Sequence, residues 1–250
     1  MTLHRLTPTL LIAPAYAPFV SDFIARTKVL LGGNIHSLYM CGSIPRGTAI
    51  PGKSDADFTI VTNARVGIPV TNALEELKRN LVDEYPFVTK IDTPMCTVEQ
   101  VLSEQYEWGF WVAIVSHCIF GPDLAEAIGP LISPLKLLVA LCTDTETTVS
   151  QKLTRLASET NPESRRAEGK KLMRRLIRAL VALTVVERDA WTDDLDESER
   201  ILYEYFRKHG RLIETIFGMF SNPIDNVSDL TDVTNRAMKL YSDEYGRQAT

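Results

Sequence analysis

Two aspartates separated by one residue, Asp55 and Asp57, carry the strongest chemical signal in the sequence. They directly precede the apolar run 58–61, which favours an extended strand, and residues two apart on a strand point to the same face. Two carboxylates on one face can share hard cations such as Mg²⁺, which prefer oxygen ligands and keep positions for phosphate oxygens. An isolated Asp-x-Asp pair is more often a solvated strand edge, because acidic residues are common on surfaces. The residues around the pair decide between these interpretations.

A Gly-Ser pair, Gly42 and Ser43, precedes the aspartates, with Ser43 twelve residues before Asp55. The pair follows a predicted strand over 35–41. A glycine leaves room for a phosphate to approach the backbone, and a serine offers a hydroxyl and an amide donor to that phosphate. A solvated acidic pair has no need of such a turn. The combination therefore favours a site for a nucleoside triphosphate and a metal ion.

The elements that must position these residues form a small α/β unit. A first helix is expected to start near Ser21 and to end at Gly32, and apolar residues three and four apart predict a second helix over 70–81. β-Branched and aromatic residues predict three strands, over 35–41, 57–62 and 87–93. The segment 44–54, with two prolines and two glycines, is expected to be a loop.

The order of these signals resembles the nucleotidyltransferase superfamily, which includes polymerase beta, small stand-alone nucleotidyltransferases and antibiotic nucleotidylyltransferases. The family pattern is a strand, Gly-Ser, a frequent Arg-Gly and then Asp-x-Asp, and here Arg46 and Gly47 supply the Arg-Gly. The match covers about residues 22–103. The resemblance implies an α+β fold, with a small mixed-sheet nucleotidyltransferase domain over 1–130 and an all-α helical bundle domain over 131–250.

The resemblance also implies the catalytic and metal-binding residues. Asp55 and Asp57 would ligate Mg²⁺, and the family has a third carboxylate on a later strand. That acid is assigned to Asp92, which would complete a two-metal site or take the proton from the attacking hydroxyl. Glu99 and Glu104 are the substitutes if Asp92 points elsewhere.

The same family pattern implies phosphate contacts from the turn and the loop. Gly42 and Ser43 would hold triphosphate oxygens, while Arg46 and Lys53 would neutralise phosphate charge. Arg46 as a solvated loop residue is the alternative. Ser54 would contact phosphate or form a turn with the backbone of Ala56.

The densest basic cluster of the chain lies in its second half. Lys171, Arg174, Arg175 and Arg178 follow an i, i+3, i+4, i+7 pattern, so they share one stripe of a helix. Like charges repel, and a triphosphate opposite them would make the cluster favourable. In larger relatives a basic helix reaches back over the nucleotide, which implies that Lys171, Arg174 and Arg178 bind it. A solvated helix face with acidic partners is the alternative.

The rest of the second half predicts helices with little strand signal. They are expected over 135–157, 168–186, 197–206 and 229–241. The segment 98–129 is expected to connect the two halves. Its aromatic residues Trp108, Phe110 and Trp111 are expected in a core rather than in an acceptor pocket, and His117 is expected to be packed.

Composition narrows the class of partner. The net charge of −5 gives no overall positive field toward nucleic acid or membranes, although a tRNA acceptor stays open. Four scattered cysteines indicate reduced thiols in a cytoplasmic protein. The stretch 1–19 is broken by Pro8, Pro14 and Pro18, and predicts neither a signal peptide nor a membrane span.

The sequence therefore predicts a nucleotidyltransferase that uses two Mg²⁺ ions. It would move a nucleoside monophosphate, with AMP from ATP as the first choice, to an acceptor hydroxyl and release pyrophosphate. Chain size and the two-domain layout resemble antibiotic nucleotidylyltransferases, and this resemblance implies a small antibiotic-type acceptor. The alternatives are a toxin- or antitoxin-type enzyme that acts on a protein or tRNA, and a catalytically idle nucleotide-binding module. The position modified and the formation of a homodimer stay open.

Overall fold

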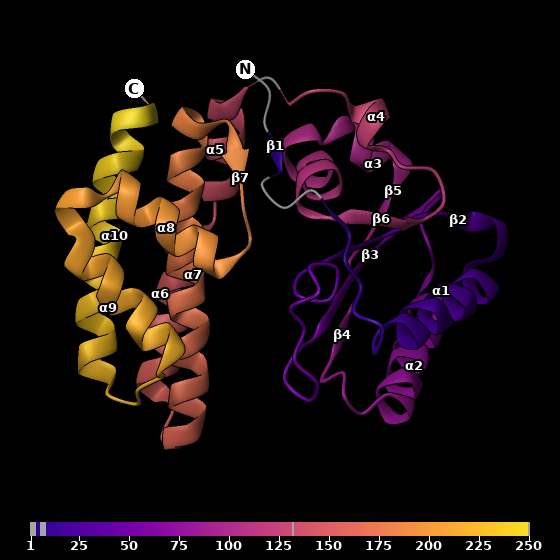
Figure 1. Cartoon of the computed structure of the whole chain (residues 1–250), viewed down its shortest axis with the longest axis horizontal. Helices are drawn as coiled ribbons and strands as arrows, with labels where there is room; N and C mark the ends of the chain where they lie inside the picture. The colour runs from indigo at the N-terminus through magenta and orange to yellow at the C-terminus, as the bar shows by residue number, and fades with distance from the viewer. Residues whose placement is uncertain (1–3, 6–8, 132, 250) are drawn as a thin grey trace. The chain divides into compact units, whose positions relative to one another are not determined.

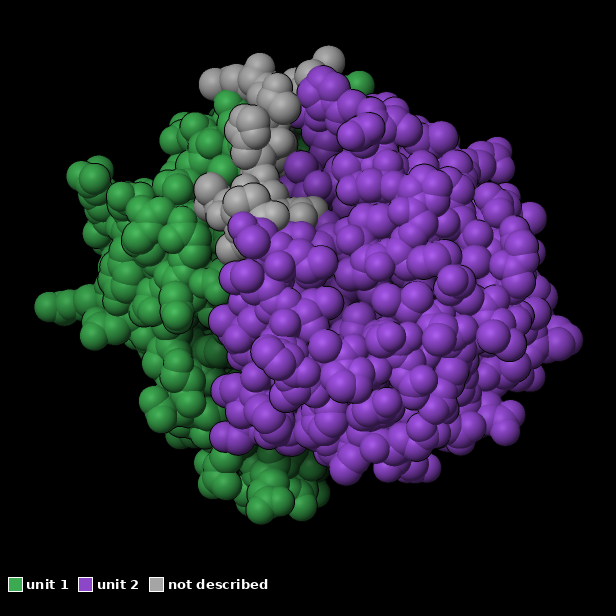
Figure 2. All heavy atoms as spheres, turned by 45° about the vertical axis from the view of Figure 1, so that its right-hand side comes forward, with its two compact units in different colours: residues 1–4, 132–250 green, residues 5–131 purple. Residues whose placement is uncertain are grey.

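The computed structural model describes residues 4–5, 9–131 and 133–249. The chain divides into two compact units, residues 5–131 and residues 1–4 with 132–250 (Figures 1 and 2). The first unit holds a small mixed sheet with helices and the second is helical, which confirms the predicted α+β fold class. Pro8, one of the prolines expected to break the N-terminal stretch, lies outside the described residues.

One mixed sheet organises the α+β unit. Its strands are β2 (Ile35–Cys41), β3 (Ala56–Thr62), β4 (Ile91–Asp92), β5 (Met95–Thr97) and β6 (His117–Phe120). The order across the sheet is β4-β3-β2-β6, and β5 also pairs with β3. The helices of this unit are α1 (Ala17–Leu31), α2 (Ile68–Glu84), α3 (Val98–Ser103) and α4 (Ala125–Ile128). Three short turns complete it: η1 (Gly32–Asn34), η2 (Gln105–Gly109) and η3 (Trp111–Val115).

Strand β3 fixes the positions of the residues around the predicted site. It runs antiparallel to β2 and parallel to β4 and β5. Its register places Asp57 beside Cys41 on one side and beside Asp92 on the other. Backbone hydrogen bonds of the sheet therefore determine which residues surround Asp57.

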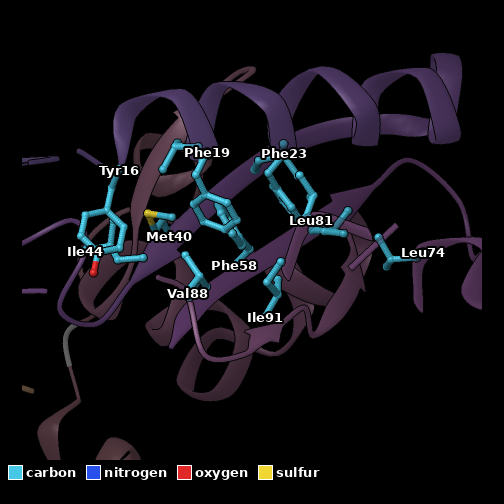
Figure 3. Close-up of a cluster of buried hydrophobic side chains, with 14 of the residues drawn as sticks. Tyr16, Phe19, Phe23, Met40, Ile44, Phe58, Leu74, Leu81, Val88 and Ile91 are labelled. Carbon is cyan, nitrogen blue, oxygen red and sulfur yellow. The ribbon is translucent and has the colours of Figure 1, made fainter. Parts of the chain in front are cut away.

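The side chains of β3 alternate between an apolar core and a polar face. Phe58 and Ile60 are buried in a core formed with α1 and α2 (Figure 3). Phe23 of α1 stacks on Phe58 with ring centroids 3.7 Å apart. Asp57 and Thr59 alternate with these residues and so face the other side of the sheet. The core packs against one face of the strand, and on the opposite face Asp57 is partly exposed.

The two helices behind the sheet follow the predicted apolar pattern. On α2, Leu74 and Leu81 are fully buried, and Val70 and Leu77 pack against the same core. α1 starts at Ala17, four residues before the expected start, because a proline fits the first turn of a helix.

The predicted strand over 87–93 is reduced to the two residues of β4. The backbone before β4 bonds to the loop instead: Gly52 N donates to Phe87 O at 2.7 Å and Thr89 N donates to Ser54 O at 3.1 Å. Residues 98–129 do not connect the two halves. They belong to the α+β unit, where β6 pairs with β2.

The second unit is a bundle around its longest helix, α7. Its helices are α5 (Pro134–Cys142), α6 (Thr145–Ser158), α7 (Pro162–Arg188), α8 (Leu195–Tyr205), α9 (Gly210–Ser221) and α10 (Val227–Ala249), with the turn η4 (Arg207–His209). A short strand, β7 (Ala190–Trp191), pairs with β1 (His4–Arg5). The expected helix over 135–157 is two helices, and α9 is an addition to the predicted set. Within the described ranges, no helix has the length and apolar character needed to cross a membrane.

Replacing Phe58 by alanine tests the core behind the sheet. Phe58 is 1% exposed, and its loss is expected to lower the free energy of unfolding by about 3–5 kcal/mol. Val29→Ala is the control, because Val29 is 86% exposed on α1 and its replacement should change stability by less than about 0.5 kcal/mol. Urea unfolding followed by circular dichroism measures both. Equal losses would contradict the packing described for Phe58.

Candidate functional site

The three carboxylates predicted to form one metal site lie together. Asp55, Asp57 and Asp92 each offer one oxygen, and these oxygens all lie within 4.8 Å of one another. The sheet explains this arrangement, because Asp57 pairs with Asp92 and Asp55 stands two residues before Asp57. All three residues are partly exposed. Oxygen donors so spaced fit a hard divalent cation with room for further oxygen ligands.

Lys90 belongs to this cluster, and the sequence analysis missed it. Its ammonium lies 2.7 Å from Asp92 Oδ1 and 2.8 Å from Asp92 Oδ2. The hydrogen bond to Asp92 raises the pKa of Lys90, and the charges of Asp55 and Asp57 raise it further. Lys90 therefore brings positive charge to three neighbouring carboxylates. The Lys-x-Asp spacing could have indicated it, since residues two apart on an extended chain share a face.

Gly42 is required at its position by the backbone and by Asp57. Its φ of +84° lies in the left-handed region that favours glycine. A Cβ built on Gly42 would lie only 2.9 Å from Asp57 Oδ2. Any side chain here would displace the carboxylate. The turn after β2 therefore has a glycine at the position where Asp57 of β3 leaves no space for a side chain.

Ser43 follows Gly42 and is partly exposed. Its carbonyl oxygen accepts a hydrogen bond from Thr48 N at 3.0 Å, which closes the turn. Its hydroxyl forms no hydrogen bond with any described residue. That hydroxyl is available to a ligand next to the carboxylates.

The other loop residues predicted to contact phosphate differ in their surroundings. The Ser54 hydroxyl accepts a hydrogen bond from Ile50 N at 2.8 Å, so it forms a turn with Ile50 rather than with Ala56. Arg46 is partly buried and Lys53 is exposed, both on the loop between β2 and β3. Phosphate contacts from Arg46, Lys53 and Ser54 stay predictions.

The face of β3 that carries Asp57 is covered further along by η3. Trp111 Nε1 donates to Thr59 Oγ1 at 2.8 Å. Phe110 is buried, Trp108 and Trp111 are partly exposed, and His117 is buried. One aromatic residue of this segment is therefore bonded to the strand that carries the aspartates.

The basic stripe of α7 lies in the helical unit, and three of its members have defined contacts. Arg175 forms an ion pair with Asp144 at 2.6 Å. Lys171 forms an ion pair with Glu168 at 2.7 Å. The guanidinium of Arg174 lies 5.6 Å from the centroid of the Phe220 ring, within cation–π range. Arg178 is exposed on the same helix. The Glu168 contact is of the kind that the solvated-face alternative expects, and nucleotide binding by Lys171, Arg174 and Arg178 stays a prediction.

The architecture, a mixed-sheet unit followed by a helical unit, is that of a nucleotidyltransferase of known structure. That structure is spectinomycin adenyltransferase AAD(9) from Enterococcus faecialis, crystallised with ATP and spectinomycin. The similarity has a TM-score of 0.58 at 12% sequence identity, and it covers 88% of this chain and 98% of the other. At this identity the likeness establishes the fold. No protein-family model matches the sequence, and no curated protein matches it.

Gly42→Ala tests the match between the turn and Asp57. The matched control is Gly52→Ala, because Gly52 also has a positive φ, +72°, but an added Cβ meets no atom within 4 Å. Both variants are expected to lose about 1–2 kcal/mol of stability from the backbone conformation. Only Gly42→Ala should also weaken Mn²⁺ binding, by about tenfold or more, since it displaces Asp57. Titration calorimetry with Mn²⁺ measures this, and equal affinities in the two variants would contradict the account.

Proposed function

We propose that this protein is a metal-dependent nucleotidyltransferase that moves AMP from ATP to a hydroxyl group of a small antibiotic-type molecule and releases pyrophosphate. The observation that carries the proposal is that carboxylate oxygens of Asp55, Asp57 and Asp92 lie within 4.8 Å of one another. Next to them stands Gly42, where Asp57 leaves no space for a side chain. The fold shared with an adenyltransferase crystallised with ATP supports it.

The donor set fits Mg²⁺. Its ligands are carboxylate oxygens only, and Mg²⁺ prefers such donors together with substrate phosphates. We propose that Asp55, Asp57 and Asp92 hold two ions. When bound, Mg²⁺ would lower the pKa of an attacking hydroxyl and neutralise charge on the phosphates.

The turn and loop after β2 would bind the triphosphate. Gly42 has no side chain where a phosphate must approach the backbone, and the Ser43 hydroxyl is available to donate a hydrogen bond. Arg46 and Lys53 would add positive charge from the same loop. Lys171, Arg174 and Arg178 of the helical unit would supply more charge to the triphosphate, as the family resemblance implies.

The chemistry is a displacement at the α-phosphorus. The acceptor oxygen forms a bond to that phosphorus, and the bond from the phosphorus to the pyrophosphate oxygen breaks. The hydroxyl proton passes to a carboxylate, and we assign this second role to Asp92, because it stands on the neighbouring strand beside Asp57. All three aspartates act as metal ligands.

The acceptor class rests on the fold. The similar adenyltransferase was crystallised with spectinomycin, and the likeness covers nearly all of that chain. A small hydroxyl-bearing antibiotic is therefore the acceptor we propose. The net charge of −5 gives a tRNA acceptor no overall attraction. The four cysteines all carry thiols, in keeping with the cytoplasmic location that we propose.

Asp57→Asn tests the transferase. Pyrophosphate release is measured with Mg²⁺, each of the four ribonucleoside triphosphates, and a panel of aminoglycosides, spectinomycin, lincosamides, tRNA and protein lysate. We expect release that depends on a small-molecule acceptor and falls by about a thousandfold or more in Asp57→Asn, because a metal ligand is lost.

Asp83→Asn is the matched control, since Asp83 is exposed on α2 and lies outside the carboxylate cluster. It should keep full activity. Release that persists in Asp57→Asn would contradict the site. Release only with tRNA or protein would contradict the acceptor class while leaving the reaction intact.

Metal binding can be tested without an acceptor. A ligand that binds only the folded protein stabilises it, by about 2.7 kcal/mol at one hundred times its dissociation constant. Addition of Mg²⁺ after chelator treatment should therefore raise the melting temperature of the wild-type chain but not that of Asp57→Asn. Differential scanning fluorimetry measures both. A shift of equal size in the two proteins would place the ion elsewhere.

A further inference from the structure

A second candidate site lies in the helical unit, in a cavity of about 750 Å³. The cavity is formed by η4, the first residues of α9 and the middle of α10, and α9 and α10 are packed side by side (Figure 1). None of its lining residues belongs to the carboxylate cluster or to the basic stripe of α7. Its chemistry therefore does not depend on the proposed function.

The walls of this cavity are strongly cationic. They include five cations, all exposed to solvent, against a single exposed carboxylate, Asp243: Arg207, Lys208, Arg211, Arg236 and Lys239. The cavity thus has a formal excess of four positive charges in a chain whose net charge is −5. Such a local reversal of sign concentrates anions.

Most of these cations have no ion-pair partner among the residues that the structure describes. Among the described residues, no ion pair or hydrogen bond involves the side chains of Arg207, Lys208, Arg211 or Lys239. Arg236 forms a long ion pair, with 3.5 Å between its guanidinium and a carboxylate oxygen of Asp232.

Other cations of the same unit do have acidic partners. Arg200 pairs with Glu197 at 2.6 Å, and Arg247 pairs with Glu187 at 2.9 Å. The cavity is therefore a place where like charges are gathered without internal compensation. Such an arrangement becomes favourable when an anion lies among them.

An adjoining cavity extends the same surface. It has a volume of about 460 Å³ and shares Arg207, Lys208 and Asp243 with the first. Arg247 also lines it, but this guanidinium is already bonded to Glu244 and Glu187. Two of the cations without a described partner, Arg207 and Lys208, line both cavities, whereas Arg211 and Lys239 line only the first.

We propose that the first cavity binds a small molecule that carries several phosphate groups. Arginine guanidinium groups match phosphate oxygens geometrically, and three arginines line the site. The volume lies in the range of about 300–1,000 Å³ that is typical of small-molecule sites. The cations gather around one hollow rather than along a stripe, which favours a compact polyanion over the backbone of a nucleic acid. The backbone N–H groups at the start of α9, which no side chain caps, add to the positive potential.

The test is titration calorimetry of the full chain with tripolyphosphate. The buffer contains a chelator, which removes divalent ions from the protein and the ligand. The site variant Arg207→Gln/Lys239→Gln removes two of the unpartnered cations. The control Lys152→Gln/Arg155→Gln removes the same charge from α6, outside both cavities. The site variant should bind tripolyphosphate about tenfold more weakly or worse, and the control should bind as the wild type does. Circular dichroism checks that both variants are folded.

Other results would overturn the proposal. Equal loss in the site variant and the control would show attraction by overall charge only. Loss in Asp57→Asn would assign the binding to the carboxylate site. Tighter binding of a short single-stranded RNA than of tripolyphosphate, lost in the site variant, would show a nucleic-acid surface instead. None of these results bears on pyrophosphate release, so the two proposals fail separately.

Discussion

The register of β3 is the constraint on which the rest of the site depends. A one-residue shift in a strand moves every side chain to the other face of the sheet. In the observed register Phe58 enters the core against Phe23, and Asp57 therefore faces the opposite side, next to Asp92 of β4. Apolar packing on one face of β3 thus fixes the position of Asp57 on the opposite face. The core stabilises the fold and, through the alternation of the strand, also sets the geometry of the proposed chemistry.

Charge and space at the site follow from this register. The three carboxylates, whose oxygens lie within 4.8 Å of one another, repel each other. Lys90 offsets part of this repulsion, because its ammonium forms an ion pair with Asp92. The antiparallel partner β2 ends beside Asp57, so the residue after β2 must leave room for that carboxylate, and Gly42 does so. The three neighbouring carboxylates and the turn at Gly42 thus arise from the two neighbours of a single strand. This pairing is why a metal–triphosphate function fits the unit better than a solvated acidic edge does.

The sequence predicted those parts of the molecule that depend on local pattern. Strand β2 has the predicted bounds, and the apolar face of α2 is buried as its spacing indicated. Strands β5 and β6 were missed, because short strands are stabilised by their neighbours rather than by their own residues. Lys90 was missed although it stands two residues before Asp92, a spacing that places both side chains on one face of an extended chain. The carboxylate cluster was predictable through the family resemblance, whereas the cationic cavity gathers residues from separate helices that no single stretch reveals.

The central claim is that Asp55, Asp57 and Asp92 form a metal site that receives a triphosphate. The most direct measurement is a crystal structure of the chain grown with Mn²⁺ and a non-hydrolysable ATP analogue, with anomalous scattering used to locate the manganese. The account predicts manganese bound by oxygens of all three aspartates and triphosphate oxygens at the Gly42-Ser43 turn. Manganese bound away from these carboxylates, or a triphosphate bound elsewhere with the cluster free of metal, would contradict it.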